Sequence, residues 1–195
     1  MLRRVLIIYG TSYGQTEKIA NRMASGLERR GFTVELCNAA KGRPALSLEQ
    51  YVGVVVGSST IARGHQQPIK DFISEHVATL NLVPSAFFQV SASAGSASPH
   101  ARQAAQQILE EFVAKNGWMP VLSASLPGAI NYTKYSLLLK WYMKRASAKN
   151  GGSTDTSRDH EYTDWAEVER FTMALANAFS VVREETRIPT PALSA

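Results

Sequence analysis

Residues 5–16 read Val5-Leu6-Ile7-Ile8-Tyr9-Gly10-Thr11-Ser12-Tyr13-Gly14-Gln15-Thr16, an apolar run that passes directly into a loop of small and hydroxyl residues. An uninterrupted apolar run of this kind is typical of a parallel strand that is buried on both faces of its sheet. From Gln15 onward the apolar positions take up helical spacing, with Ile19, Met23 and Leu27 on one face. The stretch therefore predicts a strand, a short loop and a helix.

The same alternation continues along the chain. Further strand-like runs occupy 33–37, 52–56, 86–90 and 119–126, and helical patterns begin near Pro68, Pro99 and Trp165. Five strands that alternate with helices predict an α/β fold with a parallel sheet covered on both faces. The segment 127–163 is far longer than the short loop that a minimal domain needs before its last helix. We therefore expect one domain over 1–185, with an insertion at 127–163 and a flexible tail at 186–195.

The composition is that of an ordinary globular protein. Of the 195 residues, 45% are hydrophobic and 19% are charged, and the formal net charge is +5. A basic balance suggests anionic partners but does not choose among nucleic acid, membrane headgroups and small molecules. The single cysteine, Cys37, fits a reducing compartment. The N-terminal apolar run is too short for a signal peptide, and no stretch approaches the roughly 20 apolar residues of a membrane span, so we expect a cytoplasmic protein.

The loop Thr11–Thr16 is a candidate phosphate site. Ligands of open parallel sheets bind beyond the carboxyl ends of the strands, and a helix N-terminus there offers unpaired N–H groups to a phosphate. The hydroxyl residues add donors, and the loop contains no Lys or Arg. A nucleoside triphosphatase loop would need a Lys after Gly14, and the dinucleotide fingerprint Gly-x-Gly-x-x-Gly is absent. The plain alternative is a hydroxyl-rich turn without a ligand.

Thr11-Ser12-Tyr13-Gly14-Gln15-Thr16 resembles the phosphate signature of the flavodoxins, Thr/Ser-x-x-Gly-x-Thr after the first strand. The resemblance implies FMN as cofactor, bound by a three-layer sandwich whose five parallel strands run in the order 2-1-3-4-5. It also implies two loops around the flavin ring, after the third and fourth strands. The predicted FMN contacts are Thr11, Ser12, Tyr13, Gly14, Gln15, Thr16, Ser58, Ser59, Thr60, Ile61, Ser91, Ala92 and Ser93. Neither ring loop supplies an aromatic residue, so Tyr13 is the nearest aromatic candidate for the ring.

Arg63 and His65 follow the third strand and are candidates for substrate contact. Arg63 could meet an anionic substrate or the flavin, and His65 could assist proton transfer because its ordinary pKa is near 6.5. The alternative is that both are solvated loop residues. The remaining histidines and Cys37 do not have the spacing of metal ligands, so no metal is predicted. The sequence does not single out a catalytic acid or base.

The insertion contains a basic stretch at 131–149 that has no acidic residue. At helical spacing one face, expected to pack on the domain, holds Tyr135, Leu138, Leu139, Tyr142, Met143 and Ala146. The opposite face holds the candidate substrate or membrane contacts Lys134, Lys140, Trp141, Lys144 and Arg145, together with Leu137. Apolar residues within a basic stripe are typical of a helix that lies on anionic lipid. The same stripe could instead line a site for a lipophilic or carboxylate-bearing substrate, or be a solvated face.

Two segments near the end of the insertion carry a more specific resemblance. Gly151-Gly152-Ser153-Thr154-Asp155-Thr156 and Tyr162-Thr163-Asp164-Trp165 are similar to the bacterial quinone-dependent protoporphyrinogen oxidases, which are flavodoxin-like and have a long insertion before the last helix. This resemblance implies FMN-dependent oxidation of protoporphyrinogen IX in heme biosynthesis. A membrane quinone would be the acceptor at the inner face of the cell membrane, with no nucleic acid partner. The alternatives are a general FMN-dependent quinone or NAD(P)H reductase and a soluble flavodoxin-type electron carrier.

Overall fold

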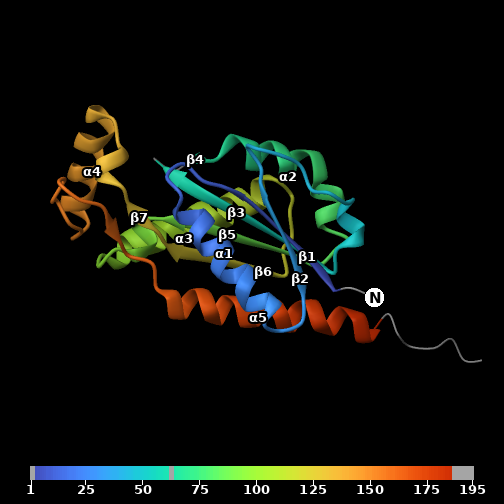
Figure 1. Ribbon diagram of the computed structural model, residues 1–195. Coiled ribbons are helices and arrows are strands. Elements are labelled where there is room, and N and C mark those ends of the chain that lie inside the picture. The colour runs from blue at the N-terminus through green and yellow to red at the C-terminus, as the bar shows by residue number, and fades with distance from the viewer. Residues whose placement is uncertain (1–2, 62–63, 186–195) are drawn as a thin grey trace, which may run out of the picture.

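The central element of the fold is a parallel sheet of five long strands (Figure 1). The computed structural model describes residues 3–61 and 64–185, with side chains up to residue 180. The strands are β1 (Arg4–Gly10), β2 (Thr33–Asn38), β3 (Gly53–Ile61), β5 (Ser85–Ser91) and β6 (Leu122–Pro127). Their order in the sheet is β2-β1-β3-β5-β6, which confirms the predicted flavodoxin-like order. Arg63 and the predicted tail at 186–195 lie outside the described residues.

Helices cover both faces of this sheet and complete the three predicted layers. One face packs on α1 (Gln15–Glu28) and α5 (Trp165–Glu185), and the other on α2 (Gln67–Leu80) and α3 (Pro99–Lys115). The apolar run of β1 divides between the two layers. Val5 and Ile7 belong to the α1–α5 core and Leu6 and Ile8 to the α2–α3 core. All four are buried, as the uninterrupted apolar pattern predicts.

The helix ends follow local rules that the sequence already contains. The Ser98 hydroxyl accepts a hydrogen bond from the N–H of Ala101 and caps α3. Asp164 Oδ1 accepts from the N–H groups of the residues that open α5. Gly31 takes the positive φ of 81° that ends α1, a conformation that costs glycine little. These features mark the start of α3, the start of α5 and the end of α1.

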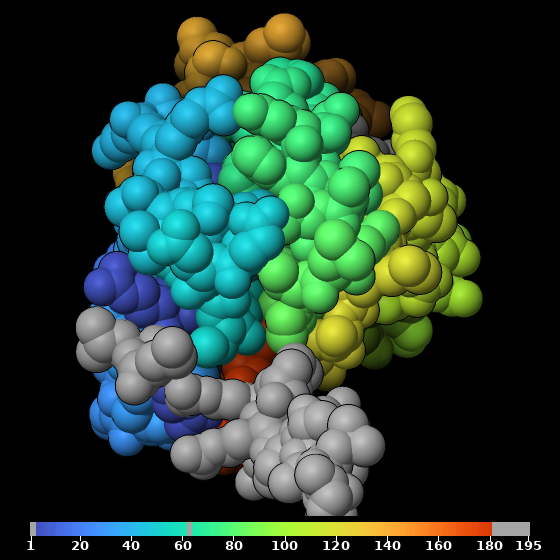
Figure 2. Space-filling view, turned by 90° about the vertical axis from the view of Figure 1, so that its right-hand side faces the viewer, coloured from blue at the N-terminus to red at the C-terminus, as the bar shows by residue number. Residues whose placement is uncertain are grey.

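The insertion forms a small subassembly beyond the carboxyl ends of the strands. It consists of β7 (Ala129–Ile130), the 3₁₀ turn η3 (Tyr132–Lys134), α4 (Leu137–Lys149) and β8 (His160–Glu161), with β7 and β8 paired antiparallel. Figure 1 shows α4 projecting from this end of the domain, and in the space-filling view of Figure 2 its orange residues stand above the rim of the body. The helix therefore touches the domain along part of its surface only.

The strand boundaries differ from the sequence prediction in two places. The predicted third strand ends at 56, whereas β3 runs to Ile61, so Ser58 to Ile61 are not a loop. Two hydroxyl residues suggest a turn, but Ser58 and Ser59 pair with β5, and Thr60 pairs with His65 of the two-residue strand β4 (Gly64–His65). The predicted fifth strand begins at 119, whereas β6 begins at Leu122.

Candidate functional site

A cavity lies beyond the carboxyl ends of the strands, between the sheet and the insertion. Its walls come from the loop after β1, the ends of β3 and β5, part of α3, and α4. The predicted FMN contacts that line it are Thr11, Ser12, Tyr13, Gln15, Thr16, Ser59, Thr60, Ile61, Ser91, Ala92 and Ser93. Gly14 and Ser58 are not among the residues that line it. The structure thus brings together three segments that are distant in the sequence.

The loop after β1 has the features of a phosphate cradle. Gly14 precedes α1 with a φ of 96°, and its N–H donates to Thr11 Oγ1 at 2.9 Å. Thr16 is fully buried in the first turn of α1, and its Oγ1 has no hydrogen-bond partner among the described residues. A buried hydroxyl without a partner costs about 1–3 kcal/mol, so this atom points to a ligand acceptor. A phosphate oxygen at the N-terminus of α1 fits both the hydroxyl and the helix dipole.

Gln66 joins this loop to the end of β3. Its Nε2 donates to Ser12 Oγ at 2.8 Å and to Ser59 Oγ at 3.0 Å. Its backbone N–H donates to Ser58 Oγ at 3.1 Å. One side chain therefore holds the predicted phosphate segment and the predicted ring segment in a fixed relation. Sequence reasoning missed Gln66, because no local pattern marks a residue that bridges two segments this far apart.

The insertion also contacts the phosphate loop directly. Gln15 Nε2 donates to Thr163 Oγ1 at 2.8 Å, and that hydroxyl donates to the carbonyl oxygen of Pro127 at 2.9 Å. Lys134 Nζ donates to the carbonyl oxygen of Tyr13 at 3.3 Å. The threonine of the Tyr162–Trp165 segment thus orients a phosphate-loop side chain. Lys134, which is predicted as a substrate or membrane contact, brings a positive charge to a loop that has none of its own.

Two tyrosines of the insertion line the cavity. Tyr135 meets Tyr13 edge to face, with 4.8 Å between ring centroids, and burial raises the pKa of Tyr135 above its ordinary value. Tyr142 lines the same cavity from α4. The aromatic surface that the loops after β3 and β5 do not offer therefore comes from the insertion. The helical spacing of these tyrosines was the only signal for it.

His65 belongs to the core and not to the cavity wall. Its ring stacks on Phe112 with 3.9 Å between centroids, and its Nε2 lies 3.2 Å from Gln89 Oε1. Because Gln89 Nε2 already donates to Ser125 Oγ, its Oε1 is the acceptor and His65 Nε2 carries the hydrogen. Burial lowers the pKa of His65 to about 4. The alternative of a solvated loop histidine is wrong, since His65 of β4 is buried, and His65, predicted as a candidate for substrate contact, does not line the cavity.

The outer surface of α4 is apolar and basic. Leu137, Leu138 and Trp141 are 86%, 77% and 58% exposed, and Lys144 and Arg145 are exposed beside them. The Arg145 guanidinium lies 5.2 Å from the centroid of the Trp141 ring. The predicted exposure of Leu137 and Trp141 is found, but the predicted packing of Leu138 is wrong. Because α4 stands at the end of the domain, that face is only partly covered: Tyr142 is exposed like Leu138, and the half-buried residues are Tyr135, Leu139, Met143 and Ala146.

Among residues 3–61 and 64–180, no three His, Cys, Asp or Glu side chains lie close enough to hold a metal ion. Within the helices that the structure describes, none has the length and hydropathy needed to cross a bilayer.

A family model for the flavodoxin domain matches residues 6–157, and the chain belongs to this family. Oxidised flavodoxin 1 from Bacillus cereus has the same fold, with a TM-score of 0.52 and 19% identity over 91% of this chain and 97% of that one. The family and this fold indicate FMN, and the Thr16 hydroxyl, the α1 N-terminus and the flanking loops fit it. The predicted cofactor is confirmed at this level.

Two curated relatives of this chain, from different organisms, carry the same name. The chain is 29% identical over 174 residues to protoporphyrinogen IX dehydrogenase (quinone) from Escherichia coli, covering 89% of this chain and 95% of that protein. A protein of the same name from Leishmania major is 28% identical over 173 residues, covering 86% of this chain and 72% of that protein. These similarities extend well beyond the phosphate loop and confirm the family resemblance that the sequence predicts.

Proposed function

We propose that this chain is an FMN-dependent oxidoreductase that oxidises protoporphyrinogen IX to protoporphyrin IX with a quinone as acceptor. The observation that carries the proposal is a single cavity with a phosphate cradle on one wall and an aromatic, basic insertion on the other. The similarity to the two dehydrogenases supports the substrate pair. An acidic surface suits a soluble electron shuttle that docks on basic partners, whereas this chain carries a net charge of +5.

The residues of the first wall hold FMN through neutral donors. Thr11, Ser12 and Thr16 offer hydroxyls to the phosphate, and the first N–H groups of α1 add the dipole of the helix. A hydrogen bond to a charged group contributes about 1.5–3 kcal/mol, so the Thr16 hydroxyl is a substantial part of the affinity. Lys134 compensates charge at the edge of the loop. When bound, FMN supplies the electron-accepting chemistry, and the chain supplies its position and surroundings.

The ends of β3 and β5 flank the flavin ring in this proposal. Ser59 to Ile61 and Ser91 to Ser93 have small or short side chains that allow a flat ring to approach the backbone. Tyr135 and Tyr142 cover the ring from the insertion and exclude water from it. The contacts of Gln66 with Ser12 and Ser59 keep the phosphate and ring segments at a constant separation.

In this proposal the outer face of α4 contacts the membrane that contains the quinone. Exposed Leu137, Leu138 and Trp141 beside Lys144 and Arg145 suit docking on an anionic membrane, where quinones reside. The propionates of the porphyrinogen complement the same cations, Lys140 included. Arg63 remains a candidate for a propionate contact. We accordingly propose peripheral association of the protein with the inner face of the cell membrane.

The test is the growth of porphyrin fluorescence from protoporphyrinogen IX under anaerobic conditions, with menadione as acceptor and with or without the protein. Growth that requires both the FMN-loaded protein and menadione is the expected result. A flavin that NAD(P)H reduces readily, and protoporphyrinogen IX never does, would replace this proposal with a general quinone reductase. If the flavin accepts electrons neither from NAD(P)H nor from protoporphyrinogen IX, the function that remains is that of a soluble electron carrier.

A further inference from the structure

A second cavity adjoins the flavin cavity on the side away from the phosphate loop. The two share Ala92, Ser93, Met143 and Ala146 as walls. The second cavity extends from there between the turn after β5 and the segment that follows α4, reaching Ala97. An occupant of this space would lie beside whatever occupies the flavin cavity. The contacts proposed for FMN leave the space unassigned.

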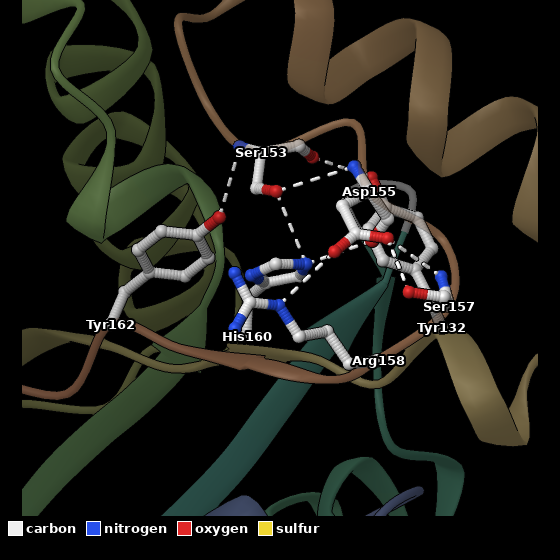
Figure 3. A network of polar contacts seen from close by, with 7 residues as sticks. All are labelled: Tyr132, Ser153, Asp155, Ser157, Arg158, His160 and Tyr162. Atoms are coloured by element: carbon white, nitrogen blue, oxygen red, sulfur yellow. Dashed lines mark hydrogen bonds and ion pairs between the residues drawn. The ribbon is translucent and has the colours of Figure 1, made fainter.

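The far wall of this cavity includes Gly151 and Gly152, and a hydrogen-bond network holds the residues that follow them in place (Figure 3). Ser153 is its centre: its N–H donates to Tyr162 Oη at 3.1 Å, and its carbonyl oxygen accepts from Tyr132 Oη at 2.9 Å. The buried Ser147 of α4 donates to the same carbonyl oxygen at 2.7 Å. His160 Nε2 lies 3.1 Å from Ser153 Oγ and 2.8 Å from the carbonyl oxygen of Asp155. The wall is therefore built into the insertion.

Two glycines set the shape of the cavity. A Cβ on Gly95 would lie 2.9 Å from Tyr162 Cβ and 3.0 Å from Pro127 Cβ, so only glycine lets the turn after β5 pass this close. A Cβ on Gly152 would collide with the Ser147 hydroxyl. Both glycines let two segments of the lining pack closely on their neighbours, and a larger side chain at either position would have to displace them.

The chemistry of the lining selects an uncharged occupant. None of the lining residues carries a charge. The polar groups are engaged with one another: Ser96 Oγ donates to the carbonyl oxygen of Asn150 at 2.8 Å, and Asn150 Nδ2 donates to that of Ala146 at 2.9 Å. A carboxylate placed here would lose its hydration without gaining a cation, which is costly. A porphyrinogen carries two propionates, whereas the ring of a quinone carries none.

We propose that this second cavity binds the uncharged ring of the quinone, between Ala97 and the Gly151-Gly152 wall and beside the flavin cavity. The inference rests on the proposed function, because that function supplies the quinone. It divides the insertion into two parts: the cations of α4 meet the acidic substrate, and the uncharged inner wall receives the acceptor. The Gly151–Thr156 and Tyr162–Trp165 segments then have a role that the phosphate loop alone does not give them.

The test places a larger side chain in the cavity by substituting an exposed residue at its rim. Ala97 is exposed at its rim, so Ala97→Phe places a ring in the cavity without disturbing the core. Ala78→Phe, on the exposed side of α2, is the matched control. Binding of menadione to the FMN-loaded, oxidised protein is measured by equilibrium dialysis, and binding of protoporphyrin IX by fluorescence titration. Ala97→Phe should weaken menadione binding at least tenfold, while its FMN and protoporphyrin IX affinities and the control variant stay at wild-type values.

Three results would overturn the inference. The wild type does not bind menadione, Ala97→Phe binds menadione as tightly as the wild type, or Ala97→Phe loses the binding of protoporphyrin IX and keeps that of menadione. If Ala97→Phe does not retain FMN, the smaller Ala97→Leu replaces it, with the same expected direction. Menadione binding that Ala97→Phe abolishes, in a protein that does not oxidise protoporphyrinogen IX, supports the quinone site and contradicts only the proposed donor.

Discussion

The two walls of the flavin cavity are built in different ways. The sheet wall is tied together by short-range polar contacts, such as Gly14 N–H to Thr11 Oγ1 and Gln66 to Ser12, and Thr16 within it is fully buried. The insertion wall keeps one edge on the domain, and its outer face, with Leu137 and Leu138, is open. The difference indicates that the sheet wall is preorganised for one cofactor, and it fits the proposal that the insertion meets partners from outside.

The strongest expected effect concerns the core behind the sheet wall. The pKa of His65 is about 4 in the folded protein, against an ordinary 6.5, because burial disfavours the charged ring. The unfolded chain therefore binds the proton more readily, and the stability present above pH 6.5 falls as the pH drops toward 4, by about 3 kcal/mol. Urea unfolding between pH 7 and pH 4.5 measures this loss.

His65→Gln cannot take up the proton and is the control for that measurement. Its stability should change less with pH than that of the wild type over the same interval. Equal slopes for the two proteins would mean that His65 is not buried behind the sheet.

The next prediction concerns substitutions that change charges on the insertion wall and none on the sheet wall. Removing the charges of Lys140, Lys144 and Arg145 should weaken binding to anionic vesicles at low salt about a hundredfold, since each cation near such a surface contributes about 1 kcal/mol. The FMN affinity should not change. Co-sedimentation with the vesicles at low and high salt measures the membrane binding, because salt screens the attraction between the cations and the anionic lipid. Lys134 is left unchanged, since it contacts the phosphate loop.

A variant with the same net charge controls for general electrostatics. Lys41, Lys70 and Lys115 lie outside the insertion, and their neutralisation should leave vesicle binding close to wild type. If both triple variants sediment alike, then the outer face of α4 is not a membrane contact and the two walls differ less than proposed.

The sequence predicts these two walls unequally well. The alternation of strands and helices and the phosphate loop follow from local spacing, whereas the strand order was predicted from the resemblance to the flavodoxins. Gln66 and the buried position of His65 depend on partners in β1, β3, β5 and α3, which no local pattern reveals. The exposure of Leu138 was missed because an amphipathic pattern assumes a full packing surface, which α4 at the end of the domain does not have.

Thr16→Val sharpens the account of the sheet wall. The variant keeps the shape of the side chain and removes a hydroxyl that is buried without a partner. It should weaken FMN binding by about 1.5–3 kcal/mol, roughly ten- to a hundredfold in affinity, while the apoprotein becomes no less stable. Fluorescence titration with FMN and thermal unfolding of the apoprotein give the two values. A parallel loss of both would assign the hydroxyl to the fold and not to the ligand.

The smallest effect is expected at Gly14. A Cβ at this position meets nothing within 4 Å, so the cost of Gly14→Val comes from its φ of 96° and not from crowding. Strain of about 1–2 kcal/mol should weaken FMN about tenfold. Gly14→Asn tolerates positive φ and should bind FMN more tightly than the valine variant. Equal affinities for the two variants would show that position 14 has the same conformation with and without FMN, so that its strain costs fold stability and not FMN affinity.

The most direct test of the central claim is anaerobic mixing of the FMN-loaded protein with protoporphyrinogen IX, followed by the flavin absorbance. The proposed function predicts that the yellow absorbance disappears as porphyrin fluorescence appears, with three flavins reduced for each porphyrin formed because the oxidation removes six electrons, and that menadione restores the absorbance. A flavin that dithionite bleaches, but that keeps its absorbance in the presence of excess protoporphyrinogen IX, would contradict the account.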